Sequence, residues 1–436
     1  MAEAYSLSAD VIVVGSGPGG ATLSRELSKR GKKVLLLESG GDHRGRLYYG
    51  TYAGAMLYSQ RLGLLFTQEG LNIVRPMLLG GATNMYCGCA APPPPWLKAK
   101  YSVDIDSEVA ETIQELGIAP LPEELRGAAS TRLAQAAQAL GYPWEPQEKF
   151  MRPARSAHFD CGAKCMLGCR CGAKWNAAEY VDDAVAQGAH LETHADVERL
   201  FIEHGECKGV SGWMRGWPFT AHADTVVLCA GGLGSPSILR MSGLTQAGEG
   251  MTMDTTVIVY GITKEKGNGM DPPMTWSWEN MADGYMLSAL ADPWLMYPII
   301  ATLKSPRYLG YFPKWKHLLG VMIKLKDEIS GKVYQDGTIS KPLTSRDRER
   351  MAEAERVSKR ILVEAGADPS TIFTSPLRGT HPSGTVRLGE MVDIDLKTEI
   401  PGCYVCDASV FPEALGRPTV LTIIGLAKRL AKHLTA

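Results

Sequence analysis

The distribution of hydrophobic and polar residues divides the chain into two kinds of region. Short, largely apolar runs occur at 11–14, 34–37 and 225–229, each bounded by glycine, alanine or charged residues. Such runs are typical of strands in a parallel sheet that is buried on both faces. After residue 252, alternating stretches at 255–260 and 285–288 favour an antiparallel sheet with one face covered. The pattern therefore predicts a parallel-sheet region and an antiparallel-sheet region.

Helices are predicted between these strands from the spacing of apolar residues. They fall at 177–187, after the glycines at 231–232, at 346–366 and at 419–433, with further helical structure within 104–140. A β-hairpin is predicted at 195–210, with its turn around 203–207. Four consecutive prolines at 92–95 form a rigid connector that cannot donate hydrogen bonds to a sheet.

The first 41 residues carry a complete motif for binding a dinucleotide. Gly15, Gly17 and Gly20 follow the first strand with GxGxxG spacing. The first glycine makes a tight turn, the second lets the backbone approach a pyrophosphate, and the third packs helix on strand. Glu38 lies 21 residues after Gly17, where an acid bonds a ribose hydroxyl. The unit predicts a dinucleotide site, either NAD or FAD, with a glycine-rich loop of another α/β protein as the alternative.

Composition narrows the possible partners. The chain has 436 residues and a formal net charge of -1 at pH 7, which gives no support for nucleic-acid binding. No run reaches 18 apolar residues, and no signal-peptide pattern precedes Asp10. We therefore expect no transmembrane segment and a cytoplasmic location, unless the chain is exported as the passenger of a partner subunit.

The cysteines are unevenly distributed. Cys87 and Cys89 form one close pair, and four others crowd into eleven residues at Cys161, Cys165, Cys169 and Cys171. In a chain without an export signal, such clustering favours metal or redox use over a disulfide framework.

The C-terminal region contains motifs of a known family. Residues 381–389 read HPSGTVRLG, and 400–434 include CDASVFP and GRPTV. With GGAT at 80–83 and AGGLGSPSILRMSG at 230–243, they follow in order the motifs of the glucose-methanol-choline family of FAD-dependent oxidoreductases, which this chain resembles.

The resemblance implies an α/β fold in which a Rossmann-type FAD-binding domain is interleaved with an α+β substrate domain built on an antiparallel sheet. We expect the FAD-binding domain at 1–100, 150–250 and 380–436, and the substrate domain at 101–149 and 251–379.

The resemblance also implies particular roles for residues. His381 matches the active-site histidine, which serves as base for the alcohol proton; a neutral imidazole with a pKa of about 6.5 suits that role. A structural histidine is the alternative. FAD would be held by Gly15, Gly17, Gly20, Glu38, Gly81, Thr83, Asn84, Val197, Ala230, Asp407, Ala408 and Pro418.

Arg417 departs from the family pattern, which has histidine or asparagine directly before the proline. A guanidinium group brings a permanent charge and a fork suited to a carboxylate or phosphate. Arg417 therefore predicts a catalytic contact with an anionic substrate or an oxyanion. The alternative is that its side chain turns away into an ion pair.

The cysteine segment resembles the site at which some sugar dehydrogenases of this family hold an iron-sulfur cluster. Cys165 and Cys169 match best, with Cys161 as third ligand and Cys171 as a further candidate, for a 3Fe-4S or 4Fe-4S cluster. Zinc, or thiols without a metal, are the alternatives.

These features predict an FAD-dependent dehydrogenase that oxidises a small-molecule alcohol by hydride transfer to flavin. Its electrons would pass singly through the cluster to an acceptor protein or subunit. One alternative is a flavin-dependent C=C reductase or desaturase with a ferredoxin-like partner. Another is a flavoprotein subunit that only transfers electrons.

Residues 292–315 scatter aromatic side chains among aliphatic and basic ones. Three interpretations are open for this segment: the wall of an apolar substrate cavity, peripheral contact with a membrane surface, or helix packing in the second domain's core.

Overall fold

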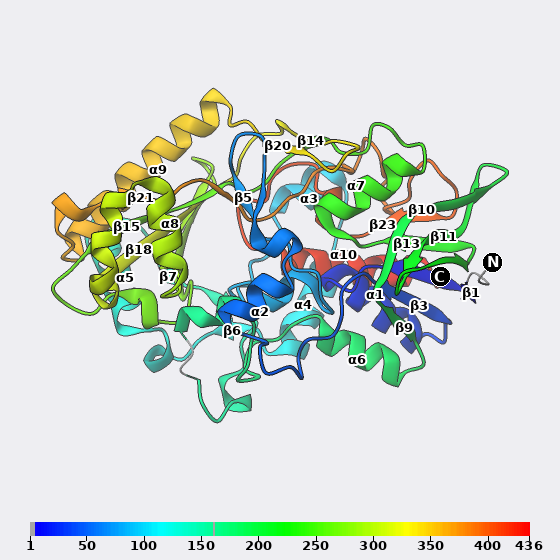
Figure 1. Ribbon diagram of the computed structural model, residues 1–436, viewed down its shortest axis with the longest axis horizontal. Coiled ribbons are helices and arrows are strands. Elements are labelled where there is room, and N and C mark those ends of the chain that lie inside the picture. Colours follow the sequence, from blue (N-terminus) through cyan, green and yellow to red (C-terminus); the bar gives the residue numbers. More distant parts are fainter. Residues whose placement is uncertain (1–4, 160–161) are drawn as a thin grey trace.

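The computed structural model describes residues 5–159 and 162–436 and has two sheet systems at opposite ends of an elongated molecule (Figure 1). The parallel sheet has the strand order β23-β13-β2-β3-β9. Its strands are β2 (Val11–Val14), β3 (Val34–Glu38), β9 (His190–Thr193), β13 (Thr225–Leu228) and β23 (Cys403–Val405). All residues of β2 and β3 are buried, as uninterrupted apolar runs require.

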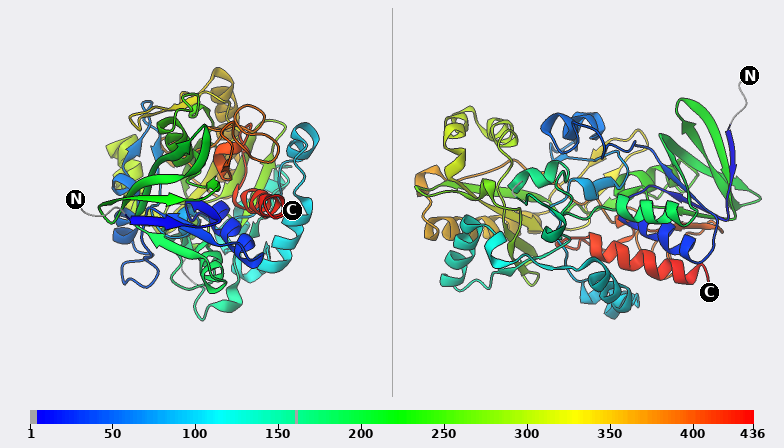
Figure 2. Two further views of the ribbon diagram at one scale, coloured as in Figure 1. Left: turned by 90° about the vertical axis from the view of Figure 1, so that its right-hand side faces the viewer. Right: turned by 90° about the horizontal axis from the view of Figure 1, so that it is seen from below.

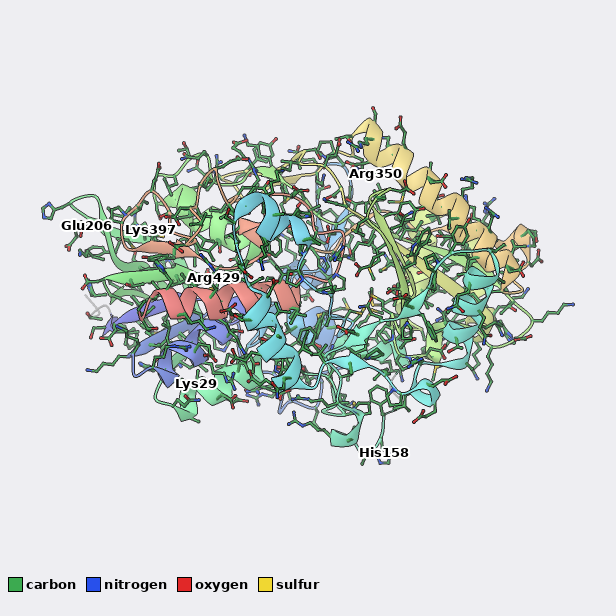
Figure 3. The ribbon with its side chains drawn as sticks, turned by 180° about the vertical axis from the view of Figure 1, so that it is seen from behind. Lys29, His158, Glu206, Arg350, Lys397 and Arg429 are labelled. Atoms are coloured by element: carbon green, nitrogen blue, oxygen red, sulfur yellow. The ribbon has the colours of Figure 1, made fainter. Side chains whose placement is uncertain are left out.

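Three helices cover one face of the parallel sheet. α1 (Pro18–Lys29) packs between α6 (Ala178–Ala186) and α10 (Val420–His433). Figure 2 shows α10 in red beside α1 in blue, and Figure 3 labels Lys29 on α1 and Arg429 on α10. The Rossmann-type architecture predicted from the sequence is confirmed.

A four-stranded sheet lies beside the parallel sheet. It has the order β1-β12-β11-β10, and β10 and β11 form the hairpin expected around residue 205. Its strands are β1 (Tyr5–Ser8), β10 (Ala195–Glu203), β11 (Glu206–Met214) and β12 (Trp217–His222).

The nine-stranded sheet at the other end is mainly antiparallel. Its path is β4-β5-β22-β15-β18-β17-β16-β7, and β21 also pairs with β15. Its strands are β4 (Leu65–Phe66), β5 (Asn72–Ile73), β7 (Glu145–Pro146), β15 (Thr256–Ile262), β16 (Trp276–Asn280), β17 (Tyr285–Ala289), β18 (Leu318–Leu325), β21 (Phe373–Thr374) and β22 (Arg378–Gly379).

Both faces of the central strands β15 and β18 are buried, whereas the sequence predicted one covered face. On one face, Val257, Val321 and similar residues pack against α5 (Ala128–Ala139) and α9 (Ser345–Glu364). On the other, residues such as Ile258 and Met322 line a cavity or contact the segment after Asp292. The second covering explains why these strands carry apolar residues on both faces.

The segment after Asp292 forms α8 (Met296–Lys304) and a 3-10 helix, η7 (Pro306–His317). Tyr297, Tyr308 and Trp315 are buried in a cluster with residues of β15 and β21. Much of its aromatic content therefore packs in the core of this half. Met296 also lines the cavity.

The remaining elements are short. The predicted helical region 104–140 contains two helices, α4 (Asp106–Leu116) and α5, because Gly117 ends α4 in a left-handed conformation. α4 packs against α10. No described helix is long and apolar enough to span a bilayer. These other elements are α2 (Tyr52–Leu57), α3 (Pro95–Tyr101), α4 (Asp106–Leu116), α7 (Gly231–Met241), β6 (Ala119–Pro120), β8 (Glu148–Lys149), β14 (Glu249–Met251), β19 (Gly331–Val333) and β20 (Ile339–Ser340).

Candidate active site

A cavity of about 790 Å³ is bounded by residues of both halves. The parallel-sheet half contributes the ends of β2, β3 and β13 and the first turns of α1, α7 and α10. The antiparallel-sheet half contributes residues of β15, β18 and β22. The carboxyl ends of parallel strands are where dinucleotides bind in such folds, so the first half forms the nucleotide end of the cavity.

The three glycines of the first turn have different structural roles. Gly15 has φ +100°, and a Cβ there would lie 2.5 Å from the Cys229 oxygen. Gly20 does not line the cavity, but a Cβ there would lie 1.8 Å from the Gly15 oxygen. Gly17 does line it, and a Cβ there would meet nothing within 4 Å. Gly15 and Gly20 therefore allow close packing, whereas Gly17 leaves space for a ligand at the free N–H groups of α1.

Glu38 ends β3 and lies on the cavity wall. Its Oε2 accepts hydrogen bonds from the Ser16 amide at 2.9 Å and the Ser16 hydroxyl at 2.6 Å, while Oε1 accepts one from the Gly40 amide at 2.8 Å. These bonds fix the carboxylate beside the glycine turn. Val197 on β10 lines the same end of the cavity.

The loop Gly81–Asn84 divides its residues between cavity and core. Gly81 and Thr83 line the cavity. Asn84 is buried outside the lining, where its Nδ2 donates to the Leu79 and Gly81 oxygens and its Oδ1 accepts from the Tyr49 hydroxyl at 2.8 Å. The polar atoms of Asn84 thus hold the loop in shape.

Asp407 joins the start of α7 to a 3-10 helix at Ala408–Val410, beside the cavity. Its Oδ2 accepts from the Gly231 amide at 2.8 Å and the Ser235 hydroxyl at 2.5 Å, and its Oδ1 accepts from the Ser409 amide. Burial raises the pKa of Asp407 above its usual range, although these bonds oppose the shift. Asp407 thus occupies the first amide of α7, whereas α10 has no side-chain cap on its first amides. Also lining this region are Ala230, Ala408 and Pro418.

His381 lies on the cavity wall and is oriented by a carboxylate behind it. Its Nδ1 is 2.8 Å from Asp254 Oδ2, and Asp254 Oδ1 accepts from the Gly416 amide at 3.0 Å. Because a carboxylate only accepts, Nδ1 carries the proton and the Nε2 lone pair is left for the cavity. Burial, together with the positive charge of Lys324, lowers the pKa of His381 below 6.5. The imidazole is therefore neutral at neutral pH.

The sequence analysis missed several polar groups of the site, among them Lys324 and Arg378 on the cavity wall and Asp254 beside His381. Lys324 of β18 donates from Nζ to Thr380 Oγ1 at 2.6 Å. Arg378 of β22 forms a bidentate pair with Asp292, with N···O distances of 2.8 and 2.7 Å. Lys324 could have been noticed in the sequence, because it is the lysine within the otherwise apolar run LLGVMIKL at 318–325.

Arg417 lies outside the cavity lining, although the next residue, Pro418, is part of it. Its Nη2 is 3.2 Å from Glu279 Oε2, and its Nη1 donates to the Pro92 oxygen at 3.4 Å. Burial raises the pKa of Glu279, and Arg417 partly offsets that effect. Arg417 thus forms an ion pair, which was the alternative considered from the sequence. It has no contact with the cavity that would support a catalytic role.

The cysteine segment does not form a metal site in the part of the chain that the structure describes. Cys161 lies outside the described residues. Cys165 is buried, and the Sγ atoms of Cys169 and Cys171 are 3.7 Å apart. Burial, reinforced by Cys165, raises the pKa of Cys169 to about 11. Among the described residues, no three His, Cys, Asp or Glu side chains are grouped to hold a metal.

Family comparisons agree with this architecture. The description "GMC oxidoreductase" applies to two family models that match residues 79–257 and 342–427, together more than half of the chain. The chain belongs to the GMC oxidoreductase family. A model for NAD(P)-binding Rossmann-like domains matches residues 13–69. The protein is accordingly a flavin-dependent oxidoreductase, and FAD is the cofactor that the family and the cavity support.

Relatives of this GMC oxidoreductase match nearly its whole length. An uncharacterised protein of Methanocaldococcus jannaschii is 29% identical, covering 98% of this chain and 99% of that protein. A long-chain-alcohol oxidase of Arabidopsis thaliana is 25% identical, covering 96% of this chain and 66% of the relative. Pyridoxine 4-oxidase from Mesorbium loti shares the fold with a TM-score of 0.72 at 17% identity, covering 97% and 98% of the two chains. A formate oxidase shares it with a TM-score of 0.73 at 15% identity, covering 99% and 98%.

Proposed function

We propose that this GMC oxidoreductase oxidises an alcohol-type small molecule, with His381 as the base for the hydroxyl proton. The observation that carries the proposal is the Asp254–His381 pair on the wall of a cavity that also contains the nucleotide turn. Bound FAD would supply the hydride acceptor for the carbinol carbon.

The chain's own contribution to the reaction is proton transfer and orientation. Asp254 holds Nδ1 of His381, so Nε2 accepts the hydroxyl proton as the substrate is oxidised. The lowered pKa of His381 keeps that nitrogen unprotonated before substrate binds. Arg417 has no part in this step, because its guanidinium pairs with Glu279.

The cofactor would be held mainly by backbone. Uncapped amides at the starts of α1 and α10, together with the positive end of the α7 dipole, favour the phosphates and an anionic ring. Gly20 and Asn84 act indirectly, by allowing close packing and by shaping the loop. The residues proposed to contact FAD are Gly15, Gly17, Glu38, Gly81, Thr83, Val197, Ala230, Asp407, Ala408 and Pro418.

Anaerobic titration of the FAD-loaded protein with a panel of primary and secondary alcohols tests this proposal. We expect at least one alcohol to bleach the flavin absorbance stoichiometrically, with a carbonyl product recovered. If no alcohol reduces the flavin while a low-potential donor such as reduced ferredoxin does so rapidly, the protein is a reductase or an electron carrier, and the proposal is wrong.

An electron relay through an iron-sulfur cluster to an acceptor protein is a second part of the proposal. It is supported by the four cysteines in eleven residues and by Met166, within that segment, which lines the cavity. Iron and acid-labile sulfide are measured on protein purified without oxygen, with the serine variant of Cys169 as comparison. A protein that contains FAD but no iron would contradict the relay, and the electrons of this GMC oxidoreductase would then pass to another acceptor.

A further inference from the structure

Lys324 is a buried lysine on the same cavity wall as His381. Along β18, Met322 and Lys324 line the cavity, whereas Ile323 and Leu325 face the cluster under α9. Lys324 is only 3% exposed, and its Nζ donates to Thr380 Oγ1. An ammonium group carries three N–H donors, so two remain without a partner among the described residues.

The other four buried lysines of the described chain are fully engaged. Lys341 and Lys428 lie within 3.5 Å of carboxylate oxygens. Lys149 and Lys174 each donate to at least three protein acceptors. Because a buried charge without partners is costly, such engagement is the rule in this protein. Lys324 differs from all four.

No protein carboxylate neutralises Lys324 directly. Within the described residues, no Asp or Glu oxygen lies within 4.0 Å of its Nζ; Asp254 and Asp327 act on it from farther away. Their oxygens already accept several protein hydrogen bonds. Asp292, on the cavity wall, is fully used by both terminal nitrogens of Arg378. Burial lowers the pKa of Lys324, and an anionic group in the cavity would stabilise the charged form of its ammonium.

The surroundings of Lys324 define the rest of the ligand. The nearby lining is largely apolar, with Ile258, Met274, Leu290, Met296 and Met322. Methionine side chains adapt to aliphatic ligands of varied shape. The wall thus suits a molecule with an apolar body and one anionic group.

We propose that Lys324 binds a carboxylate of the substrate, so that the natural substrate is a hydroxycarboxylate with an aliphatic body. This inference rests on the proposed function. There the hydroxyl group of the substrate meets His381, and here its carboxylate is assigned to Lys324. Thr380 orients the Lys324 ammonium through its hydroxyl, which in turn donates to the backbone oxygen of Asp254. Asp254 thus contacts Thr380 through its backbone and His381 through its carboxylate, which places the substrate-binding ammonium and the reaction base on neighbouring residues.

Binding of non-oxidisable ligands tests the inference without requiring turnover. Butyrate, hexanoate and octanoate are each compared with the corresponding amide by calorimetric titration into the FAD-loaded protein. We expect the best carboxylate to bind at least about tenfold more tightly than its amide. In Lys324→Met this preference should fall to about unity, whereas Lys324→Arg should retain part of it.

Lys326→Met is the matched control. Lys326 lies two residues along the chain, outside the cavity lining, and pairs with Glu413 at 2.7 Å. The Lys326→Met substitution removes the same charge and should leave the preference for carboxylates over amides unchanged. FAD content and thermal unfolding verify that each variant is folded.

Three results would overturn the inference: no carboxylate binding to the wild-type protein, a preference for carboxylates that survives in Lys324→Met, or no preference in the wild type. A lower flavin midpoint potential in Lys324→Met, with ligand preference intact, would assign Lys324 to the cofactor instead. Failure of the proposed function is distinguishable, because carboxylate selectivity would persist in a protein that no alcohol reduces.

Discussion

The two ends of the cavity are built from different parts of the chain. At the nucleotide end the wall includes a glycine turn and helix starts, with Gly17 at the start of α1 and Ala230 at the start of α7. At the antiparallel-sheet end it is largely side chains, including His381, Lys324 and Arg378. Backbone amides and helix starts accept any pyrophosphate, whereas side chains can change with the substrate. One end therefore keeps the cofactor and the other sets the chemistry.

The two ends also differ in how far apart their partners lie in sequence. Ser16 and Glu38 are separated by 22 residues within one strand-helix-strand unit. Asp254 and His381 are separated by 127 residues, and Lys324 and Thr380 by 56. The substrate end thus forms only when the nine-stranded sheet has assembled. Substitutions at the nucleotide end and at the substrate end should therefore have different effects.

The largest effect is expected at the glycine turn, where backbone packing decides the outcome. Gly20→Ala would place a Cβ 1.8 Å from the Gly15 oxygen, so α1 must move away from β2. We expect a loss of about 2–3 kcal/mol in the free energy of unfolding of the apoprotein, and loss of most bound FAD. Denaturant unfolding and flavin absorbance measure the two effects.

Gly17→Ala and Gly45→Ala are the comparisons for this site. Gly17→Ala meets no protein atom within 4 Å, so it should weaken FAD binding while leaving apoprotein stability nearly unchanged. Gly45 has open space around it and should tolerate alanine in both assays. Equal stability of the Gly20→Ala and Gly45→Ala apoproteins would contradict the packing role of Gly20.

The next largest effect is expected at the Asp254–His381 pair. His381→Ala should slow flavin reduction by alcohol about 10²–10⁴-fold while FAD stays bound, because it removes the proton acceptor. Asp254→Asn should slow it by about 10²-fold or more, because an amide no longer fixes the tautomer. Stopped-flow reduction under anaerobic conditions gives both rates.

His158→Ala controls for the loss of an imidazole, since His158 is exposed and is not part of the cavity lining. Its reduction rate should equal that of the wild-type protein. A His381→Ala variant with an unimpaired rate would mean that the proton leaves by another route, and that the substrate end does not set the chemistry.

Much of this contrast could be predicted from the sequence, but only where the information is local. The glycine spacing and Glu38 predicted the nucleotide end, and HPSGTVR made His381 the candidate base, which lies on the cavity wall. The direction of Arg417 could not be predicted, because a motif gives the position of a residue and not the partner its side chain reaches. Its partner Glu279 lies on β16, far away in sequence.

Lys324 was missed for a related physical reason. β18 reads LLGVMIKL and is buried along its whole length, so alternation separates two faces without indicating which one meets the cavity. Only the packing of α9 on one face leaves Met322 and Lys324 on the other. The antiparallel sheet was predicted, whereas its second covering layer depended on the tertiary assembly.

A smaller effect is expected in the pH dependence of flavin reduction. Reduction needs neutral His381, so the rate should fall as pH drops through its pKa, which burial and Lys324 hold below 6.5. Lys324→Met removes a nearby positive charge and should therefore move this acid limb upward by about one pH unit. A neutral alcohol is used as substrate so that carboxylate binding does not interfere. If the acid limb is unchanged in Lys324→Met, the charge of Lys324 does not influence the pKa of His381.

The smallest effect is expected at Arg417, although it directly precedes a cavity residue. Arg417→Gln breaks a pair with Glu279 that lies away from the lining, so we expect about 1 kcal/mol of destabilisation and less than about a threefold change in flavin reduction. Glu279→Gln should cost a similar amount, and the double variant less than the sum of the two, since each single change removes the same contact. If Arg417→Gln instead slows reduction tenfold or more at full FAD content, its guanidinium reaches the substrate during turnover. The side-chain wall of the substrate end would then extend to the start of α10.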